Sequence, residues 1–490
     1  MNGTELDNEK AAKEKRDEKP VTLEAFRQKL LYSQDVFQRK LVLGCRHELE
    51  VNLFYCNGLI DNNMFHMGLM PRLESWSRQS PDVEEESQSV SHPSEWFIEL
   101  DRYNASHLYA RLFAGSVILV FSDREGFFEH NIAHQPGRNP EESTMELSLK
   151  GPRDGFVESL TINIALVRMR LRTPNLYVEN FKIGTESNTE VALLYMANGA
   201  SSSTIDEARR RLEAIDISVL HGAGELEERL ADRSYALFPL IDYIGRPDYV
   251  VHALMKGRFA ILVDGSPAAL IGPGNMMLLI KSPEDAHLPF YYVSIERLLR
   301  VVGLMFSIFL PGFWIALSSF NTDQVPFTLL ATITISRIGL PLSATMEMFL
   351  MLLLFELFRE AGVRLPRPVG QTVSVVGGLI IGDAAIRAGA TSPTMLVAAA
   401  VTAVSTFTLV NQSLAGAVSL FRLLVLICAS VLGMYGFFIG MLGMFLYLCS
   451  LESFGHPYME PVAPIRFKDV LGAFLQKPWK LRSSGKRTAG

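Results

Sequence analysis

Hydrophobic and polar positions alternate along the first part of the chain in short helix-like and strand-like runs. From Thr22 to Leu43 apolar residues recur at helical spacing, which predicts a helix. Glu50–Tyr55 and Ser116–Phe121 are short apolar runs beside turn residues, a pattern typical of strands. A further helix is predicted over Phe156–Leu171, so helices and strands mix from the start of the chain.

The following stretch alternates strands with helices. Strands are expected at Val191–Met196 and Ile217–Leu220, helices at Thr204–Ile215 and Asp248–Lys256, and a hairpin of Phe259–Val263 with Ala268–Ile271. Such alternation is typical of a small α/β domain. We therefore predict two soluble α/β subdomains, the first over residues 21–175 and the second over residues 176–295.

Near Arg300 the pattern changes to long apolar runs. Val301–Phe320 holds about 20 uncharged residues, enough to cross the ~30 Å hydrocarbon core of a membrane, with a kink expected at Pro311. Further spans are predicted at Leu342–Phe358, Gln371–Ala388, Thr394–Val410 and Leu423–Leu448. The last run, of about 26 residues, suits one tilted span but not two. Phe327–Ile335 is too short to span and is expected to be re-entrant or interfacial.

The predicted plan is a cytoplasmic α/β region of two subdomains followed by an all-α polytopic membrane bundle. A disordered charged tail is expected at residues 1–20, a bundle of about five spans at residues 296–450, and a basic tail at residues 451–490. Residues 1–20 lack the apolar run of a signal peptide, so the soluble region is expected in the cytoplasm.

Lysine and arginine positions set the expected orientation of the spans. Arginines precede the first span, follow the second and precede the last, and all are expected on the cytoplasmic side: Arg297, Arg300, Arg359, Arg364, Arg367 and Arg422. The same rule places the basic tail inside, whereas a single last span would place it outside. Either the last run contains a hairpin broken near Gly433 and Gly436, or another segment is re-entrant.

Ionisable residues inside the predicted spans are costly and therefore point to function. Glu347 lies deeper than Glu356 and is the better candidate for a pore or packing role. Glu356 is close to Arg359, and its simplest interpretation is a carboxylate solvated at the interface. Asp383 and Arg387 are neighbours on one helix face. They form either a neutralising ion pair or a polar lining at the outer mouth of a pore.

Small residues recur at four-residue spacing in two of the predicted spans, a pattern that lets helix backbones approach closely. One row is Ser374, Gly378 and Gly382, and the other is Gly436 and Gly440. Such rows either pack a bundle internally or join subunits, and we expect a homo-oligomer embedded in membrane lipid.

Composition narrows the class of protein. The formal net charge of -6 is spread along the chain and gives no reason to expect a nucleic-acid partner. Cys45, Cys56, Cys428 and Cys449 are expected as free thiols in a reducing compartment, the alternative being a Cys45–Cys56 disulfide. Walker A, GxGxxG, HExxH and GxSxG motifs are absent, so we expect no enzyme activity, no cofactor and no metal.

Several segments carry a resemblance to a known family. They are Gly151–Asn163 (GPRDGFVESLTIN), the turn of Arg246, Pro247 and Asp248, Gly257–Pro267 (GRFAILVDGSP) with Asp264 and Gly265, Phe355–Gly370, Val373–Ala385 with Gly382, and Ser392–Pro393. Together they resemble the A subunit of spore germinant receptors (GerA type), from roughly Leu49 to Pro464. The chain departs from the family's usual residues at Ile244, Gly245, Ala286, His287, Ile338 and Asp383.

The resemblance implies a nutrient-sensing complex in the inner membrane of a bacterial spore. Its implied partners are a transporter-like B subunit and a lipoprotein C subunit. It also implies that A subunits assemble in a ring around a ligand-gated, ion-conducting pore that triggers germination. The alternatives are a membrane scaffold that clusters receptor subunits without conducting, and a secondary transporter, although the chain shows no internal repeat of the kind that transporters have.

Overall fold

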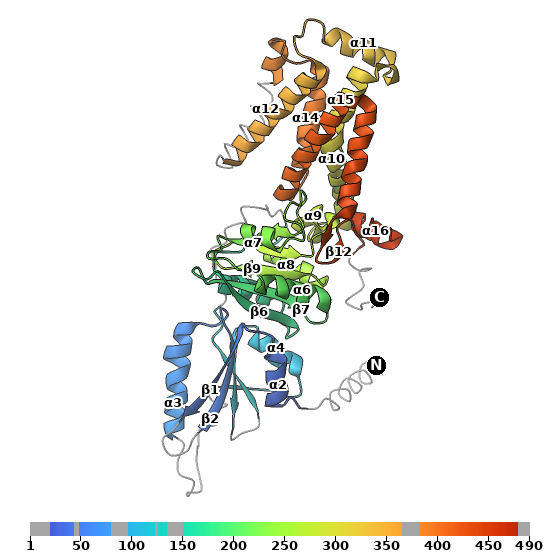
Figure 1. The fold of residues 1–490 in the computed structure, drawn as a ribbon. Helices are drawn as coiled ribbons and strands as arrows, with labels where there is room; N and C mark the ends of the chain where they lie inside the picture. The colour runs from blue at the N-terminus through green and yellow to red at the C-terminus, as the bar shows by residue number, and fades with distance from the viewer. Residues whose placement is uncertain are drawn as a thin grey trace, which may run out of the picture. The chain divides into compact units, whose positions relative to one another are not determined.

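The computed structural model describes residues 20–43, 49–79, 97–122, 126–134, 150–364 and 382–478. The chain divides into two compact units: Met1–Ala231 with Tyr243–Pro273, and Asp232–Asp242 with Gly274–Gly490. The first unit is built on two five-stranded sheets, and the second is mainly helical (Figure 1). An α/β region followed by a helical region is the order that the sequence predicts.

The first sheet has the strand order β1-β2-β4-β5-β3 and is antiparallel throughout. Its strands are β1 (Val36–Leu43), β2 (Leu49–Cys56), β3 (Ile98–Leu100), β4 (Ser116–Phe121) and β5 (Phe127–Asn131). Neighbouring residues of β2 point to opposite faces. Leu53 packs with η1 (Met64–Leu69) and α3 (Met70–Gln79), whereas Phe54 packs with α2 (Leu23–Leu30) and α4 (Ala105–Leu112). Helices therefore cover both faces of the sheet (Figure 1).

The predicted helix over Thr22–Leu43 is correct only in its first half. α2 begins where the Thr22 side chain accepts a hydrogen bond from the Ala25 N–H (3.2 Å), and it ends at Leu30. The second half is β1, in which Phe37 pairs with Tyr55 of β2. Phe37 and Leu41 are four residues apart, and that spacing places two side chains on one face of a strand as well as of a helix. The periodicity therefore did not separate the two structures.

The second sheet has the order β6-β7-β9-β10-β8. Its strands are β6 (Leu176–Ile183), β7 (Thr189–Met196), β8 (Asp242–Ile244), β9 (Phe259–Val263) and β10 (Ala269–Gly272). Helices α5 (Leu160–Arg170) and α8 (Pro247–Met255) pack together on it, α6 (Ser202–Glu213) packs beside β6, and α7 (Ala223–Leu230) packs beside β10. Every residue of β9 is buried, so both faces of the sheet are covered.

One strand predicted in this region does not form. Ile217–Leu220 has no ladder partner, although the Ile217 and Ser218 carbonyls accept hydrogen bonds from the backbone N–H groups of Thr185 and Glu186 (both 2.9 Å). The segment thus runs beside the β6–β7 turn, and of its four residues only Leu220 is buried.

A buried ion pair joins α5 to the first sheet. Arg168 donates from Nε and Nη2 to the two carboxylate oxygens of Asp35 (2.6 and 2.7 Å), with side chains 0% and 3% exposed. Its third contact is the Thr173 carbonyl (3.1 Å), and its guanidinium lies 4.4 Å from the centroid of the Phe113 ring. Burial opposes the charge, but Asp35 outweighs it and raises the pKa of Arg168. Arg168 therefore stays charged at any physiological pH.

Cys56 completes this cluster as a free, buried thiol that donates to Asp35 Oδ2 (3.3 Å). Burial, followed by the negative charge of Asp35, raises the pKa of the Cys56 thiol well above its usual value. The Cys45–Cys56 disulfide considered from the sequence is not formed, because Cys56 is free; Cys45 lies outside the described residues.

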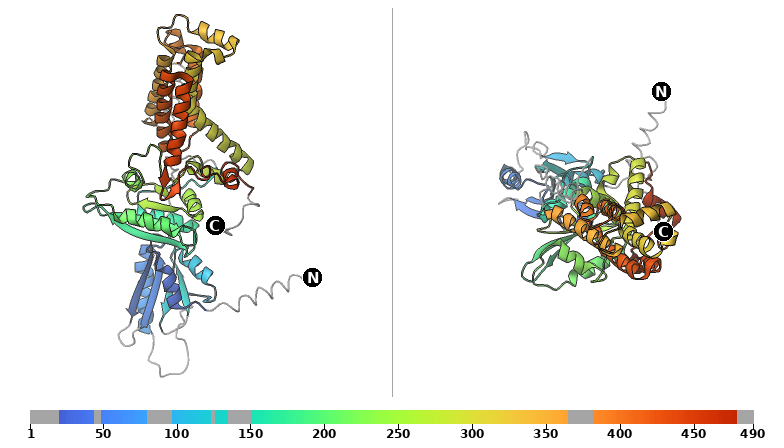
Figure 2. Two further views of the ribbon diagram at one scale, coloured as in Figure 1. Left: turned by 45° about the vertical axis from the view of Figure 1, so that its right-hand side comes forward. Right: turned by 90° about the horizontal axis from the view of Figure 1, so that it is seen from above.

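Helices α10 to α15 dominate the second unit (Figure 2). Its elements are α9 (Met276–Leu279), η3 (Pro283–Ala286), α10 (Phe290–Ile315), η4 (Ala316–Phe320), η5 (Thr322–Gln324), α11 (Phe327–Ser336), α12 (Ala344–Arg364), α14 (Pro393–Phe407), α15 (Gln412–Ser450), β11 (Glu452–Ser453), β12 (His456–Pro457) and α16 (Phe467–Phe474). Within the described ranges, two stretches are long and apolar enough to cross a membrane, Phe290–Phe320 and Ser413–Ser450. Most of the predicted span Gln371–Ala388 lies outside the described residues.

The last apolar run is a hairpin: the single span considered over Leu423–Leu448 is wrong, and the alternative of a break near Gly433 and Gly436 is confirmed. Gly433 has φ 61° and ψ -137°, a conformation that only glycine adopts easily and that interrupts the helix. A Cβ added at Gly436 would lie 2.0 Å from the Cys428 carbonyl oxygen, and one at Gly440 would lie 3.3 Å from Val425 Cα. The two arms of α15 therefore run antiparallel and in close contact (Figure 1).

Replacing Asp35 by asparagine should lower the free energy of unfolding by about 3–5 kcal/mol, because it leaves the Arg168 charge buried without a carboxylate. Urea unfolding of the full-length protein in detergent measures the loss. Asp154→Asn is the matched control, since its partner Arg170 lies on the same helix and both side chains are about one-quarter exposed. That change should cost about 0–1 kcal/mol. Equal losses would contradict the buried pair.

Cys56 should react with iodoacetamide at pH 8 at least about tenfold more slowly than the exposed Cys449, because only the thiolate is alkylated. A raised pKa leaves less thiolate at a given pH, and burial removes access as well. Mass spectrometry of timed digests gives both rates. In denaturant the two rates should converge; rapid native labelling of Cys56 would refute the buried thiol.

Candidate functional site

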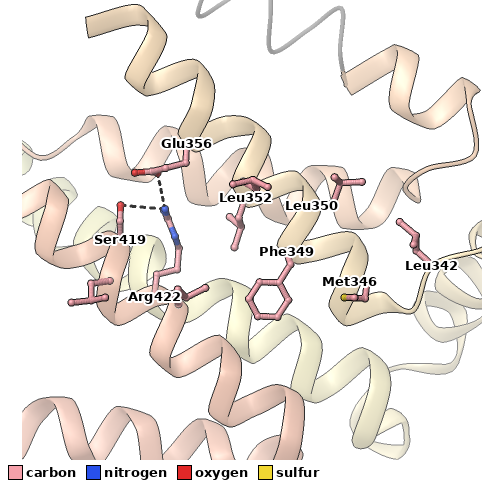
Figure 3. A pocket seen from close by; sticks show the side chains of 11 residues that line it. Leu342, Met346, Phe349, Leu350, Leu352, Glu356, Ser419 and Arg422 are labelled. Carbon is pink, nitrogen blue, oxygen red and sulfur yellow. Dashed lines mark hydrogen bonds and ion pairs between the residues drawn. The ribbon is translucent and has the colours of Figure 1, made fainter.

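Helices α12 and α15 enclose a cavity of about 660 Å³ that is apolar except at one end (Figure 3). Its apolar wall consists of Leu342, Met346, Phe349, Leu350, Leu352, Leu353, Leu420 and Leu423. Its polar end consists of Glu356, Ser419 and Arg422. An amphipathic cavity of this kind combines a large apolar surface with a few oriented polar groups.

The polar end is a hydrogen-bonded charge cluster. Arg422 donates from Nη2 to Glu356 Oε2 (3.1 Å) and to Ser419 Oγ (3.3 Å), and from Nη1 to Thr406 Oγ1 (3.2 Å). Glu356 also pairs with Arg359, one turn along α12, and Arg359 in turn donates to Ser419 Oγ (3.3 Å). Helix α12 therefore meets the consecutive helices α14 and α15 at one carboxylate and two guanidinium groups.

This cluster lies within the packed helices and not at their ends. Arg422 is 6% exposed and sits more than two turns after Gln412, where α15 begins. One turn further on, Val425 packs so closely on α10 that a Cβ at Gly312 would lie 3.0 Å from its side chain. Arg422 thus lies inside α15, and Glu356 is ion-paired while its side chain stays 37% exposed. The expected positions of Arg422 before the last span and of Glu356 at an interface stay predictions.

Glu347 is fully buried at the junction of α12 and α14. Its Oε2 accepts the Ser392 N–H (3.0 Å) at the N-terminus of α14, and its Oε1 lies 3.3 Å from Arg337 Nη2. A helix N-terminus and an arginine both favour a carboxylate at this place. Of the two roles expected for Glu347, this geometry favours packing.

Asp383 and Arg387 form an ion pair of 2.8 Å on the surface of the chain, with side chains 60% and 79% exposed. The neighbouring Gly382 faces α14, where a Cβ would meet the Leu396 side chain at 3.2 Å. Ser374 and Gly378, from the same row of small residues, lie outside the described residues. Gly436 and Gly440 lie inside the α15 hairpin, where they pack its two arms together.

The family-motif residues of the first unit lie at turns and helix starts beside the second sheet. Arg246 donates to both carboxylate oxygens of Asp248 (3.0 and 2.7 Å) at the start of α8, and the proline between them occupies the first turn. Asp264 accepts the Leu160 N–H (2.9 Å), so the β9–β10 turn caps α5. Gly265 takes φ +82° in that turn. These contacts give the motif residues a structural role at the starts of α8 and α5.

The hydrogen bonds from Arg422 to Glu356, Ser419 and Thr406 were not predicted from the sequence. The available signal was an arginine with apolar residues on both sides, which needs a carboxylate partner if it is buried. The sequence does not say which carboxylate, because Glu356 lies 66 residues away.

Comparison with known proteins assigns the chain to a family. The family model described as Bacillus/Clostridium GerA spore germination protein matches residues 24–488. Spore germination protein XA of Bacillus anthracis is 41% identical over 428 residues, which is 87% of this chain and 87% of that protein. Spore germination protein KA of Bacillus subtilis (strain 168) is 36% identical over 457 residues, which is 91% of this chain and 82% of that protein.

A solved structure is also similar to part of the chain: the N-terminal domain of the A subunit of the Bacillus megaterium spore germinant receptor GerK3. It is 28% identical, with a TM-score of 0.38, and the match covers 51% of this chain and 92% of that chain. The family match extends over both units of the present chain. The chain therefore belongs to the GerA family of spore germination proteins.

Proposed function

We propose that this chain is the A subunit of a nutrient-sensing germinant receptor, and that it oligomerises in a membrane to form a ligand-gated ion-conducting pore. Family membership supports the role in germination. The proposed partners are a transporter-like B subunit and a lipoprotein C subunit, and the proposed location is the spore inner membrane. The soluble region then carries the cytoplasmic contacts, and the helical unit carries the pore.

The proposed topology is a multi-pass one with the N-terminal region in the cytoplasm. The end of α14 approaches the first apolar turn of α10, where a Cβ at Gly303 would meet the Thr408 side chain. The starts of α10 and α15 therefore lie on one side, and the hairpin at Gly433 returns the basic C-terminal tail to that side. The positive-inside rule then makes that side cytoplasmic. α11, whose Phe327 and Ile335 are exposed, is proposed to lie at the opposite interface.

The single observation that carries the pore is the exposed pair of Asp383 and Arg387. Charged side chains at membrane depth face a bundle interior or a water-filled cavity, because hydrocarbon does not solvate them. The Glu356–Arg422 cluster meets this requirement inside one chain, whereas the surface pair does not. A ring of subunits around an aqueous path would give Asp383 and Arg387 water.

A scaffold without conduction is the second candidate. The contacts of Glu347 with Ser392 and of Arg422 with Thr406 favour it, since both join helices within the chain. The two functions differ in what substitution of the surface pair does to ion flow.

Asp383→Asn should shift the reversal potential toward the equilibrium potential of chloride, because it removes negative charge and leaves Arg387 at the mouth of the pore. The measurement is current across bilayers that contain the A, B and C subunits, in a KCl gradient, after nutrient addition. Asp323→Asn is the matched control, an exposed carboxylate in the loop between α10 and α11, and should leave the potential unchanged. Assembled complexes that never conduct would exclude the pore and leave the scaffold.

Glu356→Gln should destabilise the helical unit by about 3–5 kcal/mol, because Arg422 stays buried without its carboxylate. Thermal unfolding of the full-length protein in detergent measures this loss. Glu356→Gln with Arg422→Gln should recover part of it, since no buried charge then remains unpaired. Glu360→Gln, exposed one turn along the same helix, should change the melting temperature little. A double variant whose loss equals the sum of the two single losses would show that the residues do not interact.

A further inference from the structure

Helix α16 is only partly covered by the rest of its unit. Its apolar residues span a wide arc: Val470, Ala473 and Phe474 are half-buried against the unit, whereas Phe467 (78% exposed), Leu471 (60%) and Leu475 (53%) face outward. Phe467 and Leu471 are one turn apart, as are Leu471 and Leu475, so the exposed residues form one stripe. Ile465, just before the helix, is 65% exposed as well.

Hydrogen bonds fix the rotation of α16, so the stripe is not free to turn inward. Arg297 donates to the Ala473 carbonyl (3.4 Å), and the Gln476 N–H donates to Ser294 Oγ (3.0 Å). The Gln476 side chain donates to the Asp285 carbonyl (2.9 Å). Arg297 is itself held by Asp285 Oδ2 (2.7 Å). The start of α10 and η3 thus hold α16 with its apolar stripe outward.

Helix α10, which holds α16, also exposes apolar residues. Tyr291, Tyr292 and Ile295 are exposed on its first turns, and Leu298 and Val302 are exposed further along it. Ser294, which holds α16, lies seven residues before Val301, about 10 Å along the helix. That distance corresponds to the headgroup layer beside the hydrocarbon core. Tyrosine is the residue typical of this layer.

The sequence from Pro464 onward is strongly basic. From Pro464 to the end of the chain the basic residues are Arg466, Lys468, Lys477, Lys480, Arg482, Lys486 and Arg487, against the single acidic side chain of Asp469. Arg466 pairs with Glu460, with its side chain 60% exposed. An amphipathic helix with apolar residues on one face and surplus lysine and arginine is the pattern of helices that bind anionic lipid surfaces.

We propose that α16 is an interfacial helix: Phe467, Leu471 and Leu475, with Tyr291 and Tyr292 of α10, lie in the headgroup region of an anionic lipid leaflet. The proposal rests on the proposed membrane location of the helical unit. The helix is held at this place by Arg297, which donates to the Ala473 carbonyl and pairs with Asp285.

The test places p-benzoylphenylalanine at Phe467, Leu471 or Asp469 of the full-length protein in nanodiscs of phosphatidylcholine with phosphatidylglycerol. After irradiation, mass spectrometry counts lipid adducts at each position. Adducts at positions 467 and 471 should exceed those at 469, on the polar side of the helix, by at least about threefold. Equal yields at the three positions, or adducts to protein in place of lipid, would overturn the proposal.

A fourth position separates this inference from the proposed function. Leu446 is 63% exposed on the second arm of α15 and serves as the membrane control. Lipid adducts at 446 with none at 467 and 471 would overturn the interfacial helix alone. No lipid adducts at 446 would overturn the membrane location and the inference together.

The charge is tested by Lys468→Gln with Lys477→Gln. Each basic side chain near an anionic leaflet contributes about fivefold in binding, so the adduct yield at 471 should fall in nanodiscs that contain phosphatidylglycerol. In pure phosphatidylcholine the yield should be the same with and without the two substitutions. An equal fall in both lipids would overturn the role of anionic headgroups.

Discussion

A buried guanidinium group needs a carboxylate partner, and the resulting ion pairs fix where elements of this chain meet. The buried arginines among the described residues are Arg168, Arg246, Arg297, Arg300 and Arg422. Each forms an ion pair, and their partners are Asp35, Asp248, Asp285 and Glu356. An apolar contact tolerates small sliding of one surface over another, whereas a hydrogen-bonded pair does not. The pairs therefore set the register in which already stable elements meet.

These ion pairs differ in the number of residues that separate the two partners. The separation determines whether a pair can be recognised in the sequence. Arg246 and Asp248 are two residues apart, and their turn is visible as a motif. Arg168 and Asp35 are 133 residues apart, and Arg422 and Glu356 are 66 apart. Nothing local marks these partners, because folding alone brings them together. From the sequence, Arg422 was expected on the cytoplasmic side before the last span, and nothing local indicated that Glu356 is its partner.

The same distinction explains the successes and failures of the predicted fold. β4 has the predicted bounds because all six of its residues are buried, which gives an uninterrupted apolar run. The helix extended through Leu43 failed because Phe37 and Leu41 fit both periods. The α15 hairpin was left open because its reversal depends on the φ of Gly433 and on the close approach of Gly436 to Cys428. Composition windows detect how apolar a run is, and not where it turns.

Charges that a chain leaves unburied indicate what its surroundings must supply. Arg422 finds its carboxylate within the chain, and Glu347 is paired with Arg337 and accepts the Ser392 N–H, so both charges have partners inside the fold. Asp383 and Arg387 are exposed beside that exterior, and hydrocarbon would not solvate them. The exposed stripe on α16 needs an apolar environment instead of water, and it lies in a basic part of the sequence. In the proposed assembly, lipid would cover the stripe on α16, and water inside a ring of subunits would solvate the pair of Asp383 and Arg387.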